Sequence, residues 1–426
     1  MTPIRGAIIL VTLAAVGGAC SSTSSPPGEA SNKVIVTAPT SAVRAEDQIL
    51  KIGVLLPRSG PGSSIGVSIS RAVLTAQRLI NQDGGVLDNP ITILQRNEGS
   101  DAATVLASAR ELIDLGVDLI IGPASSNSAL AVLPTIIGAD IAVCSPAATA
   151  IALDSFPDDG LLIRTIASDT LQAEAMASLL EDTGLADVSV GYVDDPYGRG
   201  FFSALEQALV RHDLNLKATV PYSINDDDFG TEAASLLVSG SGSIALIGDA
   251  EVGPRLLSAV VKQDAATDPR GIFLNDTFRQ PLALDVVRTI QPNERSAIHG
   301  VAPMLASMNE SFLADLNFGK SPVSSSVFAS QAFDCVNLAA LAAIKMQSTN
   351  GRILLSQAES STNGGSRCSS FVECKPLVDA NFDYNGPDGT LDIGRDGDRT
   401  RGLFEPFSFD ADGRDIADGA PFAVPT

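Results

Sequence analysis

The sequence predicts an α/β protein in which helices cover both faces of parallel sheets. One observation is the length of 426 residues, which suits two domains of ordinary size. A second is the regular alternation, from Lys51 onward, of short apolar segments with segments of helical spacing. A third is that the short segments are apolar throughout, as strands buried on both faces are. Together they indicate doubly wound α/β domains.

The first half of the series runs from Lys51 to about residue 150. The expected strands are KIGVLLP, ITILQ, VDLIIGP and IAVCSP, and the expected helices are Val67 to Asn81, ATVLASARELIDL and SALAVLPTIIG. A helix separates each strand from the next, which is the connection that neighbouring parallel strands require. This half therefore predicts one complete parallel sheet with its helices.

A second series of comparable length begins after LLIRTI. Its expected helices are TLQAEAMASLLEDTG, GFFSALEQALVRH, EAASLLVSG and RLLSAVVKQ, and its strands are VSVGYVDD, NLKATVPYS, SIALIGD and GIFLND. From about Val301 the chain adds one helix, AFDCVNLAALAAIKMQ, and a turn-rich tail. Asp-Gly pairs in LFEPFSFDADGRDIA mark hairpin turns. We expect this short tail to return to the first two domains.

The charge balance excludes one class of partner. The chain has 28 basic and 50 acidic residues and a net charge of −22. Such a charge repels nucleic acid and anionic membrane surfaces, so no nucleic-acid partner is expected. Solubility is the simplest explanation of the acidity.

The N-terminus indicates export. Arg5 precedes an apolar run, GAIILVTLAAVGGA, which ends in small residues before Cys20. This pattern predicts a signal peptide over 1–19 and resembles a bacterial lipoprotein signal, with Gly17 where a Leu or Val is usual. Residues 20–47 are rich in Ser, Pro, Thr and Ala and predict a flexible tether. We therefore expect a protein outside the cytoplasmic membrane, anchored by lipid at Cys20.

The other four cysteines fit an exported chain. Cys368 and Cys374 lie in the loop GGSRCSSFVEC and predict a local disulfide. Cys144 lies in an apolar strand and Cys335 in an apolar helix, and we expect both to be buried small hydrophobic residues. No Cys/His spacing typical of zinc is present in the sequence, so neither a metal nor another cofactor is expected.

Polar residues follow several of the expected strands. Ligands of open parallel sheets bind at the carboxyl ends of the strands, so we expect a binding site there. Ser126 and Thr149 can donate to a carboxylate, and Asp249 and Asp276 can accept from an ammonium group. The four together fit a zwitterion such as an amino acid. The alternative is that the hydroxyls cap helices and that the acids are turn or cap residues.

Two short motifs suggest other functions. GSSIG resembles a nucleophile elbow with Ser64 as nucleophile and His299 later in the chain. The elbow requires the serine directly after its strand, and PRS intervenes here, so we expect a turn near the ligand and no catalytic residue. DADGRD at 410–415 and GRDGDRTRG lack the terminal Glu of a calcium loop. Hairpin turns are the expected structure of both segments.

A family resemblance rests on motifs that occur in order: KIGVLLPRSGPGSSIG, INQDGGVLDNPITIL, LIIGPASSNSALAVLP, VCSPAATA, VDDPYGRGF and AFDCVNLAALA. Together they resemble the branched-chain amino acid binding proteins, the Leu/Ile/Val-type substrate-binding components of ABC importers. The resemblance implies two lobes joined by three crossovers, with ligand enclosed by hinge closure. The first lobe would comprise 48–166 and 304–386, and the second 167–303 and 387–426.

The resemblance also assigns roles in the expected site. It implies that Ala147 and Thr149 bind the ligand's α-carboxylate, that Ser126 adds a hydroxyl, and that Tyr197 covers the ligand from the other lobe. Asp276, or Asp249, would bind the ammonium group. Two positions differ from the usual pattern: Ile65 replaces an aromatic residue, and Phe-Asp-Cys-Val replaces Tyr-Asp-Ala-Val around Cys335.

The implied function is capture of an amino acid, an amide or a related acid and its delivery to the permease subunits of an ABC importer. A monomer without enzymatic activity is expected. The alternative is a binding module that reports its ligand to a membrane receptor.

Replacement of Cys20 tests the predicted anchor. Stable anchoring generally needs more than one acyl chain, so Cys20→Ser is expected to give soluble or unprocessed protein. Membrane fractionation and intact mass are the measurements. An unchanged mass and unchanged membrane association in the variant would contradict lipidation at this residue.

Overall fold

The computed structural model describes residues 47–60, 62–237, 242–264, 271–304, 309–320 and 326–426. The predicted signal peptide, Cys20 and nearly all of the predicted tether lie outside the described residues.

The first sheet contains five parallel strands in the order β2-β1-β3-β4-β5. Its strands are β1 (Lys51–Leu56), β2 (Thr92–Asn97), β3 (Leu119–Ile121), β4 (Ala142–Ser145) and β5 (Leu162–Arg164). Its helices and turns are α1 (Ser63–Gln82), α2 (Ala102–Asp114), α3 (Ser126–Gly138), η1 (Ile151–Leu153), α10 (Glu310–Leu316), α11 (Ala329–Met346), α12 (Gly351–Leu355), α13 (Ala358–Thr362), α14 (Phe371–Cys374) and η4 (Lys375–Leu377).

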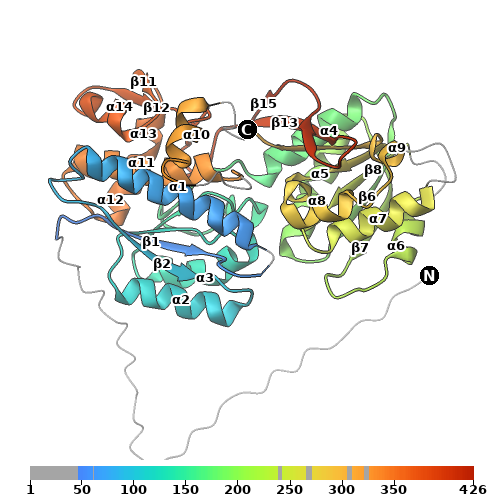
Figure 1. Cartoon of the computed structure of the whole chain (residues 1–426), viewed down its shortest axis with the longest axis horizontal. Helices are drawn as coiled ribbons and strands as arrows, with labels where there is room; N and C mark the ends of the chain where they lie inside the picture. Colours follow the sequence, from blue (N-terminus) through green and yellow to red (C-terminus); the bar gives the residue numbers. More distant parts are fainter. Residues whose placement is uncertain (1–46, 61, 238–241, 265–270, 305–308, 321–325) are drawn as a thin grey trace, which may run out of the picture. The chain divides into compact units, whose positions relative to one another are not determined.

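Helices cover both faces of this sheet because its strands are apolar on both sides. Ile52 and Val54 of β1 face a core that contains α1 and α11, whereas Leu55 faces a core that contains α2 and α3. Alternate residues of a strand point to opposite faces. Figure 1 shows α1 and α11 lying side by side on one face.

The second sheet follows the order β14-β13-β10-β9-β8-β6-β7, and β15 also pairs with β13. Its strands are β6 (Asp187–Val193), β7 (Asn215–Tyr222), β8 (Ser243–Ile247), β9 (Gly271–Leu274), β10 (Ile298–Pro303), β13 (Arg401–Phe409), β14 (Asp415–Ala417) and β15 (Phe422–Pro425). Its helices and turns are α4 (Asp169–Glu181), α5 (Pro196–Arg211), α6 (Gly230–Leu236), α7 (Gly253–Asp264), η2 (Asp276–Arg279), α8 (Pro281–Val287) and α9 (Pro292–Arg295).

This sheet is parallel from β6 to β10 and is likewise covered on both faces. One core contains α4 and α5, and the other contains α6, α7 and α8. The predicted fold class, with parallel sheets between helices, is therefore confirmed. The chain passes between the sheets three times, after β5, after β10 and before β13.

The tail adds an antiparallel edge to the second sheet. β13 pairs with β10, β14 and β15 in antiparallel register. The segment DADGRD forms the predicted turn between β13 and β14, where Asp410 Oδ1 accepts from the backbone N–H groups of Asp412 and Arg414. An Asp that satisfies its own turn in this way explains the carboxylate spacing without a cation.

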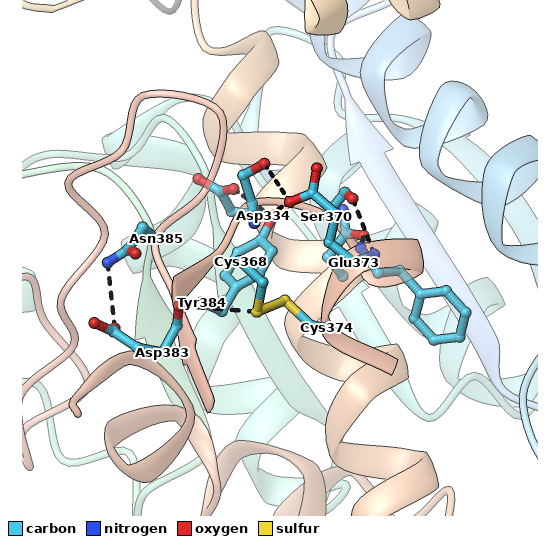
Figure 2. Close-up of a disulfide and its surroundings, with 11 residues drawn as sticks. Asp334, Cys368, Ser370, Glu373, Cys374, Asp383, Tyr384 and Asn385 are labelled. Atoms are coloured by element: carbon cyan, nitrogen blue, oxygen red, sulfur yellow. Dashed lines mark hydrogen bonds between the residues drawn. A yellow bond between two sulfur atoms is a disulfide. The ribbon is translucent and has the colours of Figure 1, made fainter. Parts of the chain in front are cut away.

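A small substructure follows α11. β11 (Ser366–Cys368) pairs in parallel with β12 (Phe382–Tyr384), and the predicted Cys368–Cys374 disulfide is present. Figure 2 shows that disulfide beside Tyr384, whose hydroxyl donates to Asp334 Oδ1 of α11 at 2.7 Å. Burial raises the pKa of the Asp334 carboxyl well above its usual range.

Cys144 and Cys335 are both buried, as expected, and the question of whether they are free or bridged is answered by a disulfide between β4 and α11. The two strand and helix patterns gave no sign of this pairing, because the cysteines are 191 residues apart in sequence. The bond ties the strand that precedes the SPAATA turn to the helix on the adjacent face.

The two disulfides are expected to differ in their contribution to stability. In the chain-entropy model, the stability that a disulfide contributes grows with the number of residues in the loop that it closes. The contribution is about 5 kcal/mol for Cys144–Cys335 and about 2 kcal/mol for Cys368–Cys374. We therefore expect Cys144→Ala/Cys335→Ala to lower the free energy of unfolding more than Cys368→Ala/Cys374→Ala does. Urea denaturation of both double variants checks the order. A larger loss from the short loop would contradict it.

Candidate functional site

A cavity of about 500 Å³ lies at the carboxyl ends of strands from both sheets. Every residue predicted to contact a ligand lines it: Ser126, Ala147, Thr149, Tyr197, Asp249 and Asp276. These residues follow β3, β4, β6, β8 and β9. The rule that parallel sheets bind ligands beyond their strand ends thus locates one shared cavity. Ligand contact by the six residues stays a prediction.

The Ser126 hydroxyl is held in place by a backbone group of the SPAATA turn. Its Oγ accepts from the backbone N–H of Ala150 at 3.2 Å. The neighbouring Ser125, not Ser126, caps α3, so the alternative helix-cap role does not apply to Ser126. Because a hydroxyl can accept and donate at once, Ser126 can still donate to a group in the cavity.

The Thr149 backbone is fixed from behind by a buried cation. Its carbonyl oxygen accepts from the N–H of Asp169 at 2.9 Å and from Arg164 Nη1 at 3.3 Å. Arg164 is fully buried and pairs with Asp398 at 2.5 Å and with Asp154. Thr149 itself is buried but lines the cavity. Its position therefore depends on packing and ion pairing rather than on a flexible loop.

The Tyr197 hydroxyl is oriented by β9. Asn275 donates from Nδ2 to Tyr197 Oη at 2.8 Å, and Asn275 Oδ1 accepts from the N–H of Gly248 at 3.1 Å. Burial raises the pKa of Tyr197 well above its usual range, and the charges of Asp169 and Asp276 raise it further. The phenol therefore stays protonated and can donate into the cavity.

Asp169 and Asp276 form a pair of neighbouring carboxyl groups close to Tyr197. Asp276 keeps part of its surface in the cavity and accepts from Gln172 Nε2 at 3.3 Å. Asp169 is fully buried, and neither oxygen has a partner with hydrogen-bond geometry among the described residues. A buried carboxylate without a partner is costly, so this arrangement favours a positively charged group nearby.

The pKa shifts of the two acids have the same main cause. Burial raises the pKa of Asp169 well above its usual range, and the Asp276 charge raises it further. The nearby Thr149 hydroxyl and Arg164 act in the opposite direction. Burial also raises the pKa of Asp276, against the effect of Gln172. A cation entering between them would lower both pKa values.

Asp169 was not predicted as a site residue. The strand-end rule could have selected it, because Asp169 follows β5 by five residues and is the first residue of α4. In the sequence, however, Ser-Asp-Thr before an apolar helix indicates an ordinary helix start, and Ser168 is indeed the N-cap. Only the fold brings Asp169 next to Thr149, Tyr197 and Asp276.

Two other carboxylates of the cavity satisfy backbone groups. Asp249 Oδ1 accepts from the N–H groups of Glu251 and Val252 at 2.7 and 2.6 Å. Glu98 accepts from the N–H groups of Ala124 and Ser125 at 2.8 and 3.0 Å. Asp249 therefore has the turn or cap role that the sequence offered as the alternative to ligand binding. Its second oxygen, Oδ2, has no partner among the described residues.

The GSSIG segment is not the turn that we expected. Ser64 lies inside α1, and Gly66 approaches β1 so closely that a Cβ there would lie 1.9 Å from the Pro57 carbonyl oxygen. The glycine is thus required for packing. His299, the histidine considered as a partner of Ser64, lies on β10 and pairs with Asp418 at 2.7 Å. Two residues of the GSSIG segment, Gly62 and Ile65, line the cavity.

A family model described as "Periplasmic binding protein" matches residues 49–281, which is more than half of the chain. The chain belongs to the periplasmic binding protein family. Among curated relatives, the Leu/Ile/Val-binding protein of Escherichia coli K12 is 26% identical over 193 residues, which are 45% of this chain and 52% of the relative. The chain spans about half the length of the curated relatives that it matches.

Solved structures of this kind share the fold over most of the chain. The substrate binding protein LivJ of the branched-chain amino acid transporter from Streptococcus pneumoniae, in complex with isoleucine, has a TM-score of 0.70 and 17% identity. The match covers 89% of this chain and 100% of LivJ. A solute binding protein from R. palustris in complex with 4-hydroxybenzoate has a TM-score of 0.73 and 17% identity, over 89% and 98% of the chains.

Replacement of Asp169 by Asn is expected to stabilise the ligand-free protein. Removing a buried charge next to Asp276 should raise the free energy of unfolding by about 1–2 kcal/mol at pH 7.5, more than the roughly 0.5 kcal/mol that the helix dipole would lose. The pKa of Asp169 is higher in the folded protein than in the unfolded chain. The wild-type protein therefore loses stability as the pH rises through the folded pKa, and this loss disappears toward pH ~4, where Asp169 is protonated. Urea denaturation across this pH range is the measurement.

Asp182→Asn, at the exposed far end of α4, is the matched control and should change stability little at either pH. A less stable Asp169→Asn protein at pH 7.5 would show that the Asp169 charge has a stabilising partner.

Proposed function

We propose that this periplasmic binding protein captures an amino acid or a related small polar ligand between two lobes and delivers it to an ABC importer. One observation carries the proposal: a single cavity is lined by the hydroxyl residues Ser126 and Thr149, the hydroxyl pole, and by the carboxyl group of Asp276, which with Asp169 buried beside it forms the carboxyl pole. A zwitterion has the complementary groups at one end of the molecule.

The hydroxyl pole suits the ligand's α-carboxylate. Ser126 Oγ accepts from Ala150, which leaves its hydroxyl hydrogen for the ligand. Thr149 lies on the same buried turn as Ala147. Charge-assisted hydrogen bonds of this kind are about twice as strong as neutral ones. Tyr197 would donate from the other side, since its own oxygen is held by Asn275.

The carboxyl pole suits the ammonium group. Asp276 is exposed to the cavity and Asp169 lies behind it without a partner. An ammonium group supplies three donors and a charge of opposite sign. Asp249, the second acid expected from the resemblance, is a weaker choice because its Oδ1 already accepts two N–H groups.

We assign 48–166 with 304–386 to one lobe and 167–303 with 387–426 to the other. A polar contact supports closure across the cavity: Asn127 at the start of α3 donates to Asp195 at the start of α5 at 2.9 Å. Lipid attachment at Cys20, permease subunits as partners and a monomeric state complete the proposal. No helix among the described residues is long and apolar enough to cross a membrane.

The relatives and structural neighbours are solute-binding proteins, which supports binding rather than catalysis. The alternative, a module that reports ligand to a membrane receptor, uses the same cavity. Uptake of labelled ligand by cells with and without the gene separates the two, because only an importer component changes uptake.

A thermal-shift screen of amino acids, amides and organic acids tests ligand binding itself. Ligand at about 100 times its dissociation constant should stabilise the protein by roughly 2.7 kcal/mol. Stabilisation by no compound of these classes would contradict the proposed function.

Thr149→Ala tests the hydroxyl pole with the ligand found in that screen. Loss of a charge-assisted hydrogen bond should cost about 1.5–3 kcal/mol, or roughly 10- to 150-fold in affinity. Calorimetry is the measurement, and Thr289→Ala, on an exposed turn, is the control. Wild-type affinity in both Thr149→Ala and Asp276→Ala would place the ligand elsewhere.

Tyr197→Ala tests contact from the second lobe. A residue that acts mainly in the ligand-enclosed state should, when removed, speed release more than it slows association. Stopped-flow measurements give both rates. A slower association with an unchanged release rate would assign Tyr197 to the initial encounter instead.

A further inference from the structure

The cavity is lined by more negatively charged side chains than the single α-ammonium group of a neutral amino acid can pair with. Among the residues that line it there is no Lys or Arg, but there are several acids, namely Glu98, Asp101, Asp195, Asp249, Glu251 and Asp276. Asp169 adds a further carboxyl group directly behind the wall, beside Thr149 and Asp276. The α-carboxylate and α-ammonium of a ligand cancel each other, so a neutral amino acid leaves this charge in place.

Two cations close to the cavity are already paired with other acids. Arg164, behind Thr149, is shared between Asp154 and Asp398. Arg279, close to Asp276, pairs with Glu405 and Asp415, both at 2.8 Å. Each guanidinium group therefore already faces two carboxylates, and neither offers a free charge to the cavity.

Acidic side chains occupy N–H groups at or next to the starts of four helices around the cavity, whereas the N-terminus of α1 at Gly62 has no side-chain cap among the described residues. Helix N-termini ordinarily attract anionic ligand groups. Here Asp101 caps α2 and Asp195 caps α5. Glu98 accepts from the N–H groups that precede α3, and Asp249 from those at the start of α7. These donors are therefore not available to a second acidic group on a ligand.

Some acceptor capacity remains unused. The Glu251 side chain and Asp249 Oδ2 have no partner among the described residues, and both belong to the loop between β8 and α7. Asp169, which is fully buried beside Asp276 and has no partner of hydrogen-bond geometry among the described residues, independently favours a cation on this side of the cavity. One ammonium group can satisfy Asp169 and Asp276, but not these additional acceptors.

We infer that the ligand carries a net positive charge: an α-amino acid with a second cationic group on its side chain. This inference rests on the proposed function, and it narrows the substrate class. The α-carboxylate binds Ser126 and Thr149, the α-ammonium binds Asp276 and Asp169, and the side-chain cation binds the acids of the β8–α7 loop, chiefly Glu251. Long-range attraction by the acidic cavity also speeds the encounter with such a ligand.

Lysine and norleucine form the decisive pair, because norleucine has the lysine carbon chain without the terminal ammonium. The full-length chain is titrated calorimetrically with both, and with ornithine, arginine, leucine and glutamate, at low and moderate ionic strength. At least one basic amino acid is expected to bind about tenfold or more tighter than its neutral counterpart. The difference is expected to shrink with added salt, and glutamate is expected to bind weakest.

Glu251→Gln is expected to remove most of the lysine preference while leaving norleucine affinity unchanged. Glu206→Gln, on an exposed position of α5, is the matched control and should keep the preference. Circular dichroism and the melting temperature confirm that both variants fold.

Norleucine, leucine or glutamate binding as tightly as the basic amino acids would overturn the inference and leave the proposed function intact. Binding of none of these amino acids would overturn the inference, whereas the proposed function fails only if the amides and organic acids of the thermal-shift screen also do not bind. A lysine preference that survives Glu251→Gln but is lost in Asp249→Asn would support the inferred class and move the contact to Asp249.

Discussion

The buried guanidinium group of Arg164 is the interaction on which the candidate site depends. It belongs to β5, it binds the carbonyl oxygens of Thr149 and Ala150, and it forms a two-pronged ion pair with Asp398. The backbone N–H of Arg164 also donates to the carbonyl of Gly397 at 2.8 Å. Three segments distant in sequence thus meet at one side chain. A buried cation tolerates the loss of a partner poorly, so each segment constrains the other two.

This arrangement explains how a turn made of small residues is held in one conformation. The SPAATA turn has few side-chain atoms with which to fix itself. Its carbonyl groups point back to Arg164, and Ser145 Oγ accepts from the N–H of Ala148 at 3.0 Å. Thr149, which lines the cavity, therefore has its backbone held from behind. Solved structures with the same fold contain ligands as different as isoleucine and 4-hydroxybenzoate.

Much of the fold could be predicted because its signals are local. Apolar strands and helical spacing identified both sheets. The strand-end rule selected Ser126, Thr149, Asp249 and Asp276, the family resemblance added Ala147 and Tyr197, and all six line one cavity. What the sequence missed depends on contacts between distant segments. Cys144 and Cys335 look the same in a strand and a helix whether they are free or bonded. Asp169 looks like an ordinary first-turn acid, and only the arrangement of α4 against β9 and the SPAATA turn leaves it buried without a partner.

The Cys144–Cys335 bond has a consequence for the order in which the chain can fold. Synthesis runs from the N-terminus, so β1 to β5 emerge first, and β6 to β10 follow before α11 is made. The first sheet, however, needs α11 to cover one of its faces and Cys335 to complete the bond. The N-terminal sheet therefore stays incomplete, with one apolar face uncovered and Cys144 without its disulfide partner, until β6 to β10 and α11 have been synthesised. Uncovered apolar surface promotes aggregation, so this interval is the one in which the unfinished chain is most exposed to misassembly.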